Sequence, residues 1–247
     1  MALFDSNLLF VTGKGGVGKT TLTIALGLAA QARQRQIFFV EINASPQRNP
    51  HVFAKTRKPQ QVMALAKNIS WINLNPRDSF EEYVDQHVPF KMLTRIFTRN
   101  SSVLSFVEGV PGLADLLMLG KIYELAKEYP LVIVDAPATG HGLSLLDTPA
   151  IVASAIPVGP LNRQATQIQE LMNDQKRTAF CLTTLPEEMP VAETLALHRD
   201  LTGRGFQNFG PLFINAVMPK PESHIQLPAI DRAYEDYATC DAFWHAR

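Results

Sequence analysis

A glycine-rich segment near the N-terminus carries the residues most suited to chemistry. Residues 8–21 have the sequence LLFVTGKGGVGKTT, an apolar run followed by glycines, a lysine and two threonines. The segment matches the phosphate-binding pattern G-x-x-x-x-G-K-[ST], whose fixed positions are Gly13, Gly18, Lys19 and Thr20. Glycines let backbone N–H groups surround a phosphate, and a helix that begins after them directs the positive end of its dipole at the same charge.

The two residues that end this pattern indicate a nucleoside triphosphate with its metal. Lys19 is expected to reach the β- and γ-phosphates of ATP, and the Thr20 hydroxyl is expected to bind Mg²⁺. The rest of the predicted ATP-binding loop consists of Lys14, Gly15, Gly16, Val17 and Thr21.

The same glycines also satisfy a second pattern. Gly13, Gly15 and Gly18 fit G-x-G-x-x-G, the dinucleotide fingerprint. Glu41 ends the next apolar run, where such sites place a ribose ligand. A dinucleotide site has no use for a lysine and a threonine after the last glycine, so the triphosphate interpretation is favoured and the dinucleotide is the alternative.

A second apolar run ends in a carboxylate. Residues 131–135 have the sequence LVIVD. A strand with an acidic end is typical of the Walker B element, which supplies a negative group beside Mg²⁺, so Asp135 is predicted to be a metal ligand together with Thr20. Strand-end aspartates are also common in turns, and this run alone is a weak signal.

Short apolar runs alternate with helical stretches along the chain. The strand, loop and helix of residues 8–33 lead into a second strand at 36–42, which predicts a right-handed parallel crossover. The further predicted strands are 69–74, 131–134, 178–183 and 212–216. We therefore expect an α/β fold with a doubly wound, mostly parallel sheet of about six strands, as in P-loop NTPases, and ligands at the carboxyl ends of the strands.

One long segment does not fit this alternation. Residues 78–129 are helical in pattern and too long for a simple crossover, so we expect a helical subdomain inserted into a single domain of residues 1–247. Its apolar side chains are expected to pack on the core and on each other, with an exposed client-binding groove as the alternative. The polar segment 47–67 is predicted to be a loop.

The amino-acid composition limits the classes of function that are expected of the chain. The chain of 247 residues is 46% hydrophobic and 19% charged, as in ordinary globular proteins. Its 23 basic and 23 acidic residues cancel, which argues against an extensive nucleic-acid interface. Cys181 and Cys240 form no C-x-x-C pair, so neither a zinc site nor a disulfide framework is indicated, and we expect a cytoplasmic protein. No apolar stretch reaches the ~18 residues of an integral membrane segment.

Several of these segments resemble one family. The loop GKGGVGKTT resembles the deviant Walker A motif of the class that contains ParA and MinD, nitrogenase iron protein, and the arsenite-pump (ArsA) and tail-anchored-protein-targeting ATPases. Residues 135–143, DAPATGHGL, are similar to the D-T-A-P-T-G-H-T segment of the last two, with Ala136 and Gly142 in place of two threonines. Residues 109–115, and Asn215 with Pro219, are similar to two further segments of that family.

The resemblance implies a dimer, either a homodimer or a heterodimer with a paralogue, that closes when ATP bridges its subunits. It implies that residues 135–141 relay the ATP or ADP state to a client on the helical subdomain. In this class Lys14 crosses the dimer interface to the partner's nucleotide, whereas the residues alone favour a solvated loop lysine. Asn215, with Pro219 nearby, is implied to contact adenine, and a turn asparagine is the alternative.

The sequence departs from the family at three points. The arsenite-binding cysteines and the zinc C-x-x-C of the targeting factors are missing. Asn43 stands where the family has the aspartate that orients the attacking water. We therefore expect a slow ATPase whose catalytic residues are Lys14, Lys19, Asn43 and Asp135. The alternatives are a catalytically weak ATP-binding subunit and, less favoured because the C-terminal tail is not basic, a ParA- or MinD-like positioning ATPase.

Overall fold

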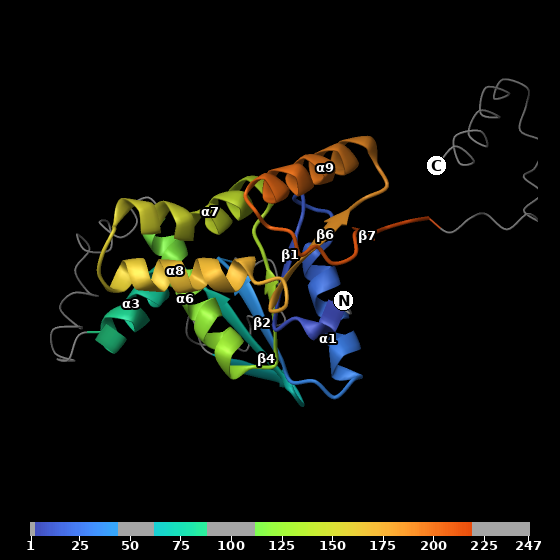
Figure 1. The fold of residues 1–247 in the computed structure, drawn as a ribbon. Helices are drawn as coiled ribbons and strands as arrows, with labels where there is room; N and C mark the ends of the chain where they lie inside the picture. The colour runs from blue at the N-terminus through green and yellow to red at the C-terminus, as the bar shows by residue number, and fades with distance from the viewer. Residues whose placement is uncertain (1–2, 44–61, 88–111, 219–247) are drawn as a thin grey trace, which may run out of the picture. The chain divides into compact units, whose positions relative to one another are not determined.

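The computed structural model describes residues 3–43, 62–87 and 112–218, and its elements lie within one compact unit, residues 1–216. A seven-stranded sheet runs through the unit in the order β3-β4-β2-β5-β1-β6-β7 (Figure 1). The strands are β1 (Leu8–Thr12), β2 (Ile37–Ile42), β3 (Met63–Ala66), β4 (Ile69–Leu74), β5 (Leu131–Asp135), β6 (Thr178–Thr184) and β7 (Phe213–Ile214). All neighbouring pairs are parallel except β3 and β4, so the expected mostly parallel sheet is confirmed.

Helices cover both faces of the sheet. They are α1 (Lys19–Gln31), α3 (Pro76–His87), α6 (Leu113–Glu128), α7 (Thr139–Ala155), α8 (Pro160–Asn173) and α9 (Glu188–Gly203), with a short 3₁₀ turn, η1 (Leu3–Asp5). Side chains of α6 to α9 share one core cluster with alternate strand residues, and α1 shares the other cluster with the remaining strand residues. The fully buried runs of β1, β2 and β5 follow from this two-sided cover, which parallel sheets require.

The sheet contains a strand that the sequence analysis did not predict. Met63–Ala66 falls within the predicted loop 47–67 but pairs antiparallel with β4. Three of its four residues are exposed, because β3 is an edge strand with little apolar burial to mark it. The connection contains Asn68 at φ 65°, a left-handed conformation that asparagine tolerates and that closes the tight turn into β4.

The structure describes the two ends of the predicted helical insertion. α3 follows β4, and α6 leads into β5, whereas residues 88–111 lie outside the described part. α6 is buried through Leu116, Met118, Leu119 and Ile122 in the same cluster as the strands. The last helix of the insertion therefore also serves as the crossover helix that covers the sheet. In the described residues no helix is long and apolar enough to cross a membrane.

Candidate nucleotide site

The glycine-rich loop lies at the carboxyl end of the central strands. β1 pairs with β5 on one side and β6 on the other. The chain leaves β1 for β2 in one direction along the sheet, and leaves β5 for β6 in the opposite direction. β1 therefore ends at a topological switch point, where open α/β sheets bind their ligands.

Two glycines of the loop cannot be replaced without displacing neighbours. Gly18, the residue before α1, has φ 93°, and a Cβ there would lie 2.1 Å from Asn215 Nδ2. A Cβ on Gly13 would lie 2.3 Å from the Thr183 carbonyl oxygen, which belongs to β6. The backbone of the loop is therefore held between β6 and Asn215, and it leads directly into the N-terminus of α1, where anions bind favourably.

Contacts within the chain hold the loop in this shape. Val17 is buried, and its carbonyl oxygen accepts a hydrogen bond of 2.9 Å from Asn215 Nδ2. The Lys19 side chain is also buried, and its Nζ donates to the Lys14 carbonyl oxygen at 2.9 Å. Gly15 and Gly16 are exposed on the loop, and Thr21 is exposed in the first turn of α1. The structure thus brings all the predicted loop residues and Asn215 together, while Pro219 lies outside the described residues.

The two predicted metal ligands meet directly. Thr20 Oγ1 donates a hydrogen bond of 2.5 Å to Asp135 Oδ2, although 115 positions separate them in sequence. Asp135 is buried at the end of β5, opposite Val11 of β1, and both ligands line a cavity of about 230 Å³. A hydroxyl beside a carboxylate is the hard oxygen donor set that Mg²⁺ prefers, so these residues fit the metal.

Lys14 has a partner that the sequence did not indicate. Its Nζ lies 2.7 Å from Glu193 Oε1, on α9, and both side chains are about one-third exposed (31% and 38%). The sequence separation of 179 residues, with no motif around Glu193, explains why sequence reasoning missed the pair. In this conformation Lys14 is bound within its own chain.

Glu41, near the end of β2, and Asn43, directly after β2, have different surroundings. Glu41 is buried, accepts a hydrogen bond of 3.2 Å from Trp71 Nε1, and lies opposite Asp135 in the sheet. A ribose hydroxyl would have to displace this buried contact, which disfavours the dinucleotide alternative. Asn43 has φ 50°, and its N–H donates to the Leu74 carbonyl oxygen at 2.7 Å. Its left-handed backbone turns the chain away from the direction of β2.

Residues 135–143 connect this site to the helices. The segment passes from β5 into the first turn of α7, where the Gly142 N–H donates to the Ala138 carbonyl oxygen. A Cβ at Gly142 would lie 2.9 Å from the Pro137 carbonyl oxygen, which explains why a threonine is absent there. Burial raises the pKa of Asp115, in the first turn of α6, and the charge of His141 opposes that shift.

Comparison with known proteins agrees with this geometry. The profile of the family described as anion-transporting ATPase matches residues 6–159, which include the loop, Asp135 and His141. The chain belongs to this family. Together with the site, membership identifies the chain as an ATP-binding ATPase of the ArsA and GET3 type.

Three named relatives are similar to this anion-transporting ATPase family member over most of its length. The chain is similar to ATPase BagA of Mycobacterium tuberculosis, with 29% identity over 95% of this chain and 71% of that protein. Similarity to ATPase GET3 of Malassezia globosa is 21% identity over 92% of this chain and 78% of that protein. With the arsenical pump-driving ATPase of Escherichia coli it is 28% identity over 88% of this chain and 36% of that protein.

Proposed function

We propose that this ATPase is a dimeric switch that binds MgATP in residues 13–21, hydrolyses it slowly, and passes its nucleotide state to helices that contact a client. The observation that carries the proposal is the 2.5 Å contact between Thr20 Oγ1 and Asp135 Oδ2. It joins the phosphate loop to the carboxylate of β5, and hydrolysis of a metal-bound triphosphate needs both groups at one point.

The residues of the site have distinct proposed roles. The loop N–H groups and Lys19 bind the β- and γ-phosphates, and Thr20 with Asp135 holds Mg²⁺. When bound, Mg²⁺ neutralises the charge that develops on the transferred phosphoryl group. Asn43 can accept a hydrogen bond from the attacking water, but an amide cannot take its proton. The absence of a base at this position is the reason we expect slow turnover.

Two contacts support a route from the nucleotide to α6. The charge of His141, in the segment after β5, lowers the pKa of Asp115 against the larger effect of burial, and a Cβ at Gly112 would lie 3.2 Å from Thr148 Cγ2 on α7. The start of α6 is therefore packed closely against α7, which begins in the segment that carries His141. A shift of residues 135–141 with the γ-phosphate would move α7 and, through it, α6, which leads from the proposed client-binding insertion.

Dimer formation requires Lys14 to change partners. In this conformation Glu193 neutralises the lysine within the chain. For Lys14 to reach a nucleotide in a second subunit, that ion pair must break, and the phosphate oxygens must replace the Glu193 carboxylate. Whether the second subunit is another copy or a paralogue does not alter this exchange.

Three measurements on the purified chain test the proposal. Calorimetry compares ATP with NADH, single-turnover hydrolysis is followed with and without Mg²⁺, and light scattering measures mass with a non-hydrolysable ATP analogue. We expect ATP to bind more tightly than NADH, hydrolysis to require Mg²⁺, and the analogue to increase the dimer. Tighter NADH binding would return the dinucleotide alternative. ATP-dependent dimerisation with no hydrolysis would favour a catalytically weak binding subunit. Asn43 would account for that result, because its amide cannot act as a base.

A further inference from the structure

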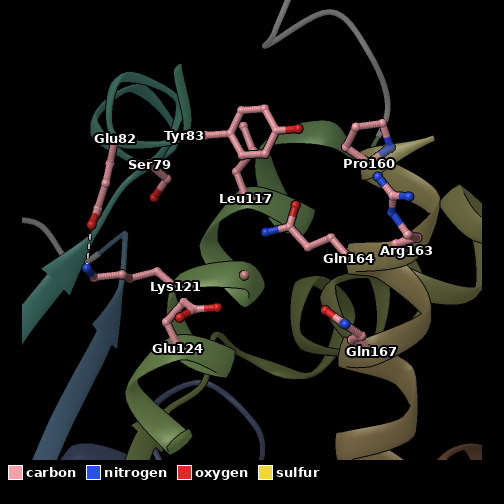
Figure 2. Close-up of a pocket in the computed structure, with 11 residues that line it drawn as sticks. Ser79, Glu82, Tyr83, Leu117, Lys121, Glu124, Pro160, Arg163, Gln164 and Gln167 are labelled. Carbon is pink, nitrogen blue, oxygen red and sulfur yellow. Dashed lines mark hydrogen bonds and ion pairs between the residues drawn. The ribbon is translucent and has the colours of Figure 1, made fainter. Parts of the chain in front are cut away.

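A second cleft lies between α3, α6 and α8. Its volume is about 490 Å³, within the range of small-molecule sites. Leu117 and Gly120 of α6 line it. The other lining groups are mostly hydroxyl, amide and charged groups from all three helices (Figure 2). None of its lining residues belongs to the phosphate loop or to β5.

The amide of Gln164 is central to this cleft. It reaches from α8 toward α6, where the lack of a side chain on Gly120 makes room: a Cβ there would lie 2.3 Å from Gln164 Nε2 (Figure 2). Gln164 Oε1 is buried and has no hydrogen-bond partner in the described part of the chain. A buried acceptor without a donor is costly, so a small turn of the amide that brings this oxygen to a ligand N–H in the cleft would relieve an unfavourable state.

Opposite charges flank that amide. On one side Arg163, at the start of α8, makes no side-chain hydrogen bond or ion pair with a described residue and is exposed. On the other side the Glu124 carboxylate of α6 points toward the middle of the cleft (Figure 2). Among the described residues its ion-pair partner is Lys127, whose Nζ lies 3.8 Å away. The cleft therefore offers a cation and an anion that the described residues neutralise weakly.

The other two charged residues of the cleft form an ion pair with each other. Lys121 Nζ lies 2.5 Å from Glu82 Oε1 and ties α6 to α3 along one wall. This pair leaves Arg163 and Glu124 as the charges available to a ligand. A polyanion such as a nucleotide would face the Glu124 and Glu82 carboxylates, and a simple cation would face Arg163 and Lys121, so both are disfavoured.

We propose that this cleft binds a small zwitterion, a free amino acid or a dipeptide, with its carboxylate at Arg163, its ammonium group at Glu124 and an N–H at Gln164 Oε1. The guanidinium group suits a carboxylate because its paired N–H donors match the two oxygens. A dipeptide supplies the additional amide N–H that Gln164 accepts, and Leu117 with Pro160 gives an apolar surface for its side chains. The proposal does not depend on nucleotide binding.

The test uses the full chain without nucleotide. Each L-amino acid and a set of dipeptides that vary in side chain are screened by saturation-transfer NMR, and those that bind are titrated by calorimetry. We expect at least one zwitterion to bind, and its N-acetylated and C-amidated forms to bind at least about tenfold more weakly, because each loses one charge-assisted contact. No binding by any member of the panel, or equal binding of the capped forms, would overturn the proposal.

Three variants locate the site. Arg163→Ala should weaken the zwitterion by about 10- to 100-fold, the effect of one charge-assisted contact, whereas Arg199→Ala, an exposed arginine on α9, should not. Gly120→Ala removes no polar group but displaces the Gln164 amide, and should also weaken binding. A zwitterion that binds Arg163→Ala and Arg199→Ala equally well occupies another surface, and that result would contradict the assignment.

Discussion

The nucleotide loop and the α3/α6/α8 cleft are built by different means. The loop is one continuous segment that presents backbone N–H groups, and its path is enforced by close approach to Thr183 and Asn215. The cleft presents side chains from three helices, and its glycine, Gly120, faces only the flexible end of Gln164. The loop therefore tolerates no side chain at Gly13 or Gly18, whereas the contacts of the cleft can be altered one side chain at a time.

Lys19→Ala separates the two regions most strongly. Loss of charge-assisted contacts to two phosphates should weaken ATP by about 10²–10⁴-fold, because each is worth about 1.5–3 kcal/mol. Zwitterion binding in the cleft should not change. Calorimetry with both ligands measures this, and Lys176→Ala, an exposed lysine, is the matched control. Unchanged ATP affinity in Lys19→Ala would remove the nucleotide role of the loop.

Asn43→Asp tests whether a missing general base is what makes ATP hydrolysis at the loop slow. Aspartate tolerates the left-handed backbone at φ 50°, so the substitution should not disturb the fold. Single-turnover hydrolysis should rise by about 10²-fold, the lower end of the range for a positioned base. Asn68→Asp, at φ 65° in the β3–β4 turn, is a control with the same backbone. A fast wild type, with no gain from Asn43→Asp, would mean that another group holds the water.

Gly18→Ala and Gly120→Ala compare the tolerance of the two regions. At Gly18 the left-handed φ of 93° and the 2.1 Å approach to Asn215 should lower the free energy of unfolding by about 1–3 kcal/mol. At Gly120 the side chain of Gln164 can move aside, and alanine favours the helix, so stability should not fall. Urea unfolding measures both. Equal losses would show that the cleft is as constrained as the loop.

Glu193→Gln should give the smallest effect. The ion pair with Lys14 is partly exposed and is worth at most about 1 kcal/mol, so its loss should increase the ATP-dependent dimer by two- to fivefold, roughly the same energy. Light scattering with a non-hydrolysable ATP analogue measures the dimer. Glu188→Gln, in the first turn of the same helix, is the control. A weaker dimer in Glu193→Gln would show that the glutamate supports the interface and does not compete with it.

The spacing of apolar and polar residues is enough to predict the order and type of the main elements. β4 has the predicted bounds 69–74, and β2, β5 and β6 differ from prediction by one residue at one end. The phosphate-binding loop is also predictable from the sequence. The motif G-x-x-x-x-G-K-[ST] depends on the local backbone conformation and on the helix that follows, and both are controlled by neighbouring residues. The fully apolar runs likewise predict buried parallel strands, because a strand that is covered on both faces has no position for a polar side chain.

The contacts that join distant segments have no such signature in the sequence. The exposed edge strand β3, the pairing of Lys14 with Glu193, the burial of Glu41 under Trp71 and the cleft around Gln164 have no local pattern. Each depends on how the elements pack, and one side chain on a helix gives no sign of the surface it will face. Residue spacing predicts the backbone conformation of a single segment. A contact between two side chains that are far apart in the sequence can be predicted only once the order of the strands in the sheet is known.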